Sequence, residues 1–107
     1  MIQVEGTLPV AIPVVTEHAA TKLRKIVMRQ MTAIEYLQAQ TGIKEGQFIA
    51  IADLSAMTKL VDEVGTVHEM TYEMLGNSSR SNLEYLQGKR AELDAKEAAE
   101  SSEAEPE

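Results

Sequence analysis

The side chains best suited to proton transfer are grouped in the second half of the sequence. His68, Glu69, Tyr72 and Glu73 would fall within about two turns of a helix. A histidine beside a carboxylate is a typical proton-transfer pair near neutral pH. The solvent-facing side of an ordinary helix has the same composition, and we favour that interpretation.

The histidines do not predict a metal site. His18 and His68 are 50 positions apart, and no second histidine follows His68 at the spacing of a zinc-binding helix. The chain has no cysteine, which excludes disulfides and thiolate ligands. Its glycines are too scattered for a phosphate-binding loop. We therefore predict a non-enzymatic protein without metal or cofactor, and a small enzyme acting through His68 is the least favoured alternative.

A cluster of basic residues lies on a segment that is rich in aliphatic side chains and that we expect to form a partly exposed β-strand. The basic residues are Lys22, Arg24, Lys25 and Arg29. Such a cluster can contact phosphates, so a small DNA-binding regulator is the alternative function. No aromatic residues accompany the cluster and the C-terminal end of the chain is acidic. We therefore favour protection of a strand edge or contact with a protein partner.

The basic segment leads directly into a well-marked helix. Thr32 and Glu35 have the spacing of a capping box, in which each side chain bonds to the other residue's backbone amide. Gly42 is expected to end this helix in the left-handed conformation. Upstream, Leu8–Val15 supplies another apolar strand, joined through a turn that includes His18. The pattern predicts a β-hairpin over about residues 8–30.

The rest of the chain has the apolar spacing of helices. Between Phe48 and Val64, apolar residues recur at every third or fourth position. Gly65 predicts a break or bend, and Ser81 with Glu84 predicts the capping box of a last helix. We therefore predict an α+β fold in which a β-hairpin or short sheet is followed by three or four helices over residues 32–93.

Charge is distributed unevenly along the chain of 107 residues. Of the net charge of -7, residues 91–107 contribute -6, from seven acidic residues and Lys96. Residues 95–107 contain no large apolar side chain, so we predict a disordered acidic tail after a single domain at 1–94. The N-terminus lacks a secretion signal and no apolar run approaches the ~20 residues that cross a bilayer. We expect a cytoplasmic protein that does not enter a membrane.

Four apolar side chains of the expected central helices are candidates for contact with another protein. Methionine is flexible, so it suits surfaces that adapt to varied apolar partners. Packing within the core is the alternative explanation for the same spacing. The candidates are Met57, Val61, Met70 and Met74.

Two segments together resemble a known family. The strand ending at Ile26-Val-Met-Arg-Gln-Met-Thr32 and the helix Ala33-Ile-Glu-Tyr-Leu-Gln-Ala39, preceded by Leu8–Val15, resemble the tail assembly chaperones of Mu-like long-tailed bacteriophages. Residues 72–86 are similar to a later part of the family pattern, an apolar helix, a glycine and a Ser-capped helix. The resemblance implies a chaperone of virion assembly in the host cytoplasm. Such a protein binds apolar helical segments of the tape-measure protein and keeps them soluble, and homo-oligomerisation stays open.

Overall fold

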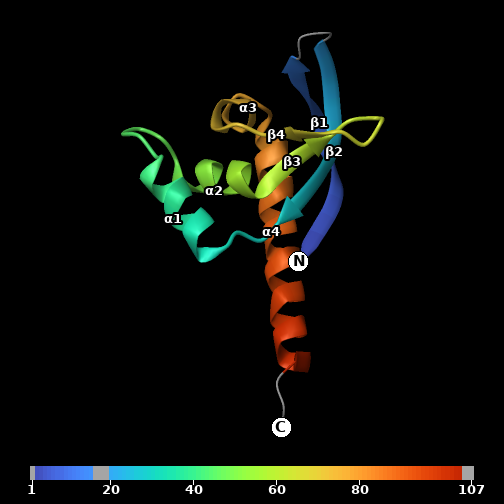
Figure 1. Cartoon of the computed structure of the whole chain (residues 1–107). Coiled ribbons are helices and arrows are strands. Elements are labelled where there is room, and N and C mark those ends of the chain that lie inside the picture. The colour runs from blue at the N-terminus through green and yellow to red at the C-terminus, as the bar shows by residue number, and fades with distance from the viewer. Residues whose placement is uncertain (1, 16–19, 105–107) are drawn as a thin grey trace.

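The computed structural model describes residues 2–15 and 20–104, with side chains up to residue 100. Its strands form one antiparallel sheet in the order β1-β2-β3-β4, and helices cover one face of it (Figure 1). The predicted α+β fold class is thus confirmed. The elements are β1 (Gln3–Val15), β2 (Ala20–Arg29), α1 (Ala33–Thr41), α2 (Ile49–Met57), β3 (Thr58–Val61), β4 (Val67–Glu69), α3 (Tyr72–Gly76) and α4 (Arg80–Ala104).

The N-terminal hairpin forms as predicted and is longer than expected. β1 pairs with β2 from Gln3 opposite Arg29 to Val15 opposite Ala20. β1 is an edge strand, which explains why it tolerates Pro9 and Pro13: a proline cannot donate a hydrogen bond to a second neighbouring strand. His18, in the predicted turn, lies outside the described residues.

Helix α4 replaces β2 as the partner of β1 where the pairing is interrupted, between Thr7 and Ile12. The Thr7 amide donates to the Tyr85 hydroxyl at 2.9 Å. Asn82 is fully buried, accepts from the Val10 amide at 3.0 Å and donates to the Val10 carbonyl at 2.9 Å. A carboxamide therefore supplies both hydrogen bonds that a neighbouring strand would otherwise make.

The glycine at residue 6 leaves room for this contact. A Cβ atom there would lie 2.1 Å from the Tyr85 hydroxyl oxygen, well inside contact distance. The absence of a side chain allows α4 to approach the strand closely.

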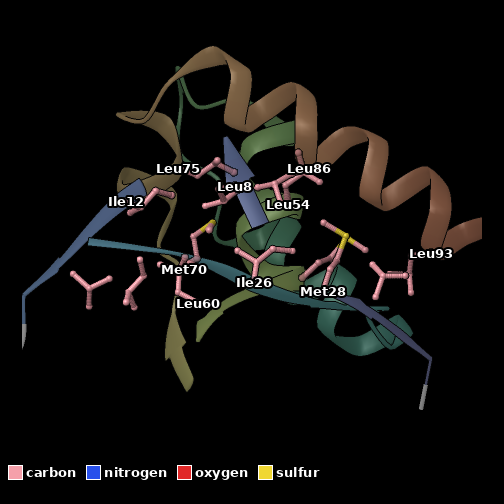
Figure 2. Close-up of a cluster of buried hydrophobic side chains, with 14 residues drawn as sticks. Leu8, Ile12, Ile26, Met28, Leu54, Leu60, Met70, Leu75, Leu86 and Leu93 are labelled. Atoms are coloured by element: carbon pink, nitrogen blue, oxygen red, sulfur yellow. The ribbon is translucent and has the colours of Figure 1, made fainter. Parts of the chain in front are cut away.

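The core lies between α4 and the sheet, where α2 and α3 close it on one side (Figure 2). Its largest members come from every layer of the fold, so a single apolar cluster joins the sheet to the helices. The buried apolar residues are Val4, Leu8, Ile12, Val14, Leu23, Ile26, Met28, Leu54, Met57, Leu60, Met70, Leu75, Leu86 and Leu93.

The predicted central helix is wrong beyond Met57. Residues Thr58–Val61 form β3 and alternate between buried and half-buried side chains, the period of a strand. β3 pairs with β2 from Ile26 opposite Leu60 to Met28 opposite Thr58. Gly65 has φ +88° and lies in the turn from β3 to β4, so it reverses the chain instead of bending a helix. Pairing with β2 thus overrides the helical spacing of the apolar residues.

The predicted caps have mixed outcomes. The Thr32–Glu35 capping box is present: Thr32 Oγ1 accepts from the Glu35 amide, and the Glu35 carboxylate accepts from the Thr32 amide. Gly42 follows α1, but with φ -80° it is right-handed, so the predicted left-handed cap is wrong. The predicted cap at Ser81 is also wrong, because the helix starts one residue earlier and Ser79 Oγ accepts from the Ser81 amide.

The acidic C-terminal segment is helical over most of its length. We expected disorder from Ala95, but α4 continues to Ala104, so that prediction is wrong for residues 95–104. Alanine, glutamate and lysine have high helix propensity, and the segment contains no glycine or proline before residue 106. Every described side chain after Leu93 is exposed. No helix within the described part of the chain has the length and apolarity needed to cross a bilayer.

Candidate functional site

The predicted partner-binding residues do not form an open groove. Met57 and Met70 are 2% and 4% exposed and belong to the core, so the prediction is wrong for these two. Val61 and Met74 are half-buried, on β3 and α3 respectively. Met57 and Met70 pack inside the domain, which was the alternative explanation.

Most of the exposed large apolar side chains among the described residues lie elsewhere, on residues 33–49, which we call the arm. The arm comprises α1, the loop after it and the start of α2, and it projects to one side of α4 and the sheet (Figure 1). α1 buries none of its side chains. Five of the nine exposed large apolar residues among the described residues are on the arm: Ile34, Tyr36, Leu37, Phe48 and Ile49.

Two of these residues share the outer face of α1. Ile34 and Leu37 are 69% and 60% exposed and are three positions apart, so they are neighbours on the helix surface. Gln40 and the half-buried Ala39 lie on other sides of the helix. α1 therefore exposes two neighbouring large apolar side chains, which an amphipathic surface helix would normally bury.

Polar contacts hold the arm to the rest of the domain. Asp53 of α2 is buried, accepts a hydrogen bond from Gln40 Nε2 at 3.0 Å and lies 3.6 Å from Arg90 Nη1 of α4. A buried carboxylate needs such partners because desolvation of an unpaired charge is costly. At the other end of the loop, the Phe48 amide donates to the Tyr72 hydroxyl at 2.8 Å. These bonds position the arm without burying its apolar side chains.

Arg29 and Glu35 fix the start of α1. Arg29 Nη1 and Nη2 donate to the two Glu35 carboxylate oxygens at 3.1 and 2.8 Å. The hydrogen bond from Arg29, followed by that from the Thr32 amide, lowers the pKa of Glu35 to about 2. The same pair raises the pKa of Arg29. The structure thus separates Arg29 from the other basic residues and assigns it to the junction of β2 and α1.

The remaining basic residues, Lys22, Arg24 and Lys25, are exposed on β2. β2 is an interior strand, yet β3 pairs only with its residues 26–28. On the side away from β1, no described strand pairs with residues 20–25. A groove of about 550 Å³ opens there between β2 and the turn joining β3 to β4.

The residues around His68 do not assemble into a proton-transfer site. His68 lies on β4, not on a helix, and its Nε2 is 2.9 Å from Asp62 Oδ2 in the β3–β4 turn. This hydrogen bond is the main reason that the pKa of Asp62 is lowered. Glu69 forms an ion pair with Lys59 across the β3–β4 hairpin. The Tyr72 hydroxyl accepts the hydrogen bond from the Phe48 amide of the arm. Within the described residues, no three or more histidine, aspartate or glutamate side chains are placed to hold a metal ion.

Comparison with known proteins adds no relative. No protein-family model, curated protein or solved structure matches this chain.

Proposed function

We propose that this protein is a tail assembly chaperone of a long-tailed bacteriophage, and that the arm is its binding surface. It binds apolar helical segments of the tape-measure protein in the host cytoplasm and keeps them soluble until the tail tube assembles. The observation that carries the proposal is the exposed apolar face of α1, a capped helix that buries no side chain.

An exposed cluster of large apolar side chains on a small domain typically marks a protein-binding surface. Without a partner, Ile34 and Leu37 face water, which gives the isolated domain no stability. Covering them with an apolar helix would bury them by helix-to-helix packing, a common form of peptide recognition. The arm therefore suits a partner that is itself helical and apolar.

The family resemblance and the exposed surface involve the same part of the chain. The segment that resembles the phage chaperones, residues 26–39, contains the end of β2, the Thr32–Glu35 capping box and most of α1. The side chains in this segment that we propose for binding are Ile34 and Leu37. They replace the methionines as candidate binding residues.

Isothermal titration calorimetry tests the proposal. The ligands are purified fragments of the tape-measure protein whose gene lies nearest to the gene of this chain. We expect Ile34→Ser with Leu37→Ser to weaken binding by at least about tenfold, because each buried aliphatic side chain contributes ~1.5 to 3 kcal/mol. Val15→Ser is the matched control, since Val15 is 81% exposed but lies on β1, away from the arm.

Unchanged affinity of the Ile34/Leu37 double variant would remove the arm as the binding surface. Absence of binding by the unaltered protein to every fragment would remove the tape-measure protein as the partner.

A further inference from the structure

The first half of β2 has an unpaired side within an otherwise regular sheet. Residues Ala20–Lys25, which we call the open half-edge, pair with β1 on one side only. β3 ends at Val61, and the chain turns back into β4 instead of continuing along β2. No described strand therefore occupies the row beside the open half-edge that a longer β3 would fill. An unpaired strand side exposes backbone donors and acceptors that another strand can use.

The row beside the open half-edge coincides with the groove of about 550 Å³. One wall is the open half-edge and the other is the end of β3 with the turn that follows, residues 61–64, together with His68. Leu23, Val61 and Val64 provide apolar surface, and Val64 is 85% exposed. The groove thus combines a strand side with apolar contacts, as surfaces that bind extended peptides do.

The charge around the groove selects the kind of peptide. Lys22, Arg24 and Lys25 line it with three exposed cations. Of the two acidic residues there, Asp62 is already occupied: its carboxylate accepts from the Val64 and Thr66 amides and contacts His68. Glu63 is the other. The strand side of the groove is therefore positive and attracts carboxylates.

We propose that the open half-edge binds an extended acidic segment of another protein, which adds to the sheet as a strand beside β2. Because side chains of a strand alternate between its faces, the best segment alternates carboxylates, placed near Lys22 and Arg24, with apolar residues that pack near Leu23 and Val61. A second copy of this chain does not fit, since two open half-edges would bring like charges together. This site is separate from the arm and does not depend on the proposed function.

Backbone amide NMR on the full chain at low ionic strength tests the inference with three peptides, each with an acetylated N-terminus and an amidated C-terminus. The first alternates glutamate and valine, the second has the same composition in two blocks, and the third alternates lysine and valine. We expect saturable shifts of the amide signals of residues 20–25 and 61–64 with the first peptide only. Shifts of equal size with the block peptide would overturn strand addition, because only alternation presents one kind of side chain to each face.

Charge reversal provides the second test. Lys22→Glu with Arg24→Glu is expected to weaken binding of the glutamate–valine peptide about tenfold and to create binding of the lysine–valine peptide. The matched control, Lys96→Glu with Arg80→Glu, changes net charge equally at exposed positions outside the groove and the arm, and should leave both results unchanged.

Three results would overturn the inference. One is the absence of saturable shifts, which would leave the basic residues as protection against strand pairing. Another is equal weakening by the control variant. The third is tighter binding of duplex DNA than of any peptide, lost in the Lys22/Arg24 variant, which would identify a nucleic-acid site instead.

Discussion

Helices α1 and α4 use their side chains in opposite ways. α4 buries Asn82, Leu86 and Leu93 against β1 and the core, and its Asn82 and Tyr85 bond directly to the β1 backbone. α1 buries no side chain and turns Ile34 and Leu37 outward. The fold therefore depends on α4, whereas α1 is free to contribute its apolar face to a partner.

The largest expected effect on stability comes from replacing a leucine by alanine, and the same substitution in each helix distinguishes α4 from α1. Leu86→Ala removes a fully buried side chain and should lower the free energy of unfolding by ~2 to 5 kcal/mol. Leu37→Ala removes an exposed one and should change it by less than ~0.5 kcal/mol. Urea denaturation followed by circular dichroism measures both values. Equal losses would show that α1 belongs to the core.

The contact between β1 and α4 provides the next test. Gly6→Ala places a methyl group against the Tyr85 hydroxyl and should cost ~1 to 3 kcal/mol. Tyr85→Phe removes the hydrogen bond from the Thr7 amide, at a cost of ~0.5 to 1.5 kcal/mol. Because Tyr85→Phe also removes the clashing oxygen, the double variant should lose less stability than the sum of the two. Strict additivity in the same urea titrations would argue against the close approach.

Local patterns predicted the parts of the fold that depend on neighbouring residues. The Thr32–Glu35 capping box and the strand before it follow from residue type and spacing over a few positions, and both are present. The β3–β4 hairpin was missed because Met57, Val61 and Val64 keep helical spacing, while pairing with β2 decides the structure.

The arm was missed for a related reason. Ile34 and Leu37 have the spacing of a buried stripe, and a sequence pattern shows only that two side chains share a face. Whether that face is covered depends on which distant element packs against it, and here none of the described elements buries it. The Thr32 cap locates the helix in the sequence but does not indicate which side of it is exposed.

Acidification should destabilise the start of α1 before it affects the rest of the domain. The pKa of Glu35 falls from its usual 4.5 to about 2 in the folded protein, so its pairing with Arg29 stabilises the start of α1 above pH 4.5. That contribution is lost as the pH falls from about 4.5 to about 2. The protection factors of the α1 amides, which correct for the intrinsic slowing of exchange in acid, should therefore fall over this range while those of α4 do not. Glu35→Gln should abolish the difference; the same pH dependence in that variant would assign the effect to other groups.

The smallest expected effect is that of removing the end of α4. After Leu93 every described side chain of this helix is exposed, and the described contact back to the sheet is a 3.4 Å hydrogen bond from Lys96 Nζ to the Gln3 carbonyl. A chain ending at Asp94 keeps Leu86 and Leu93, and it also keeps the Asp94 carboxylate that accepts from Gln30 Nε2 at 2.8 Å. Its thermal unfolding midpoint should therefore equal that of the full chain within error, while its helical circular dichroism decreases by the residues removed. Loss of cooperative unfolding on truncation would mean that α4 needs its exposed end to stay folded. Exposed side chains of α4 would then contribute to stability, and exposure alone would no longer distinguish α1 from the helix that supports the core.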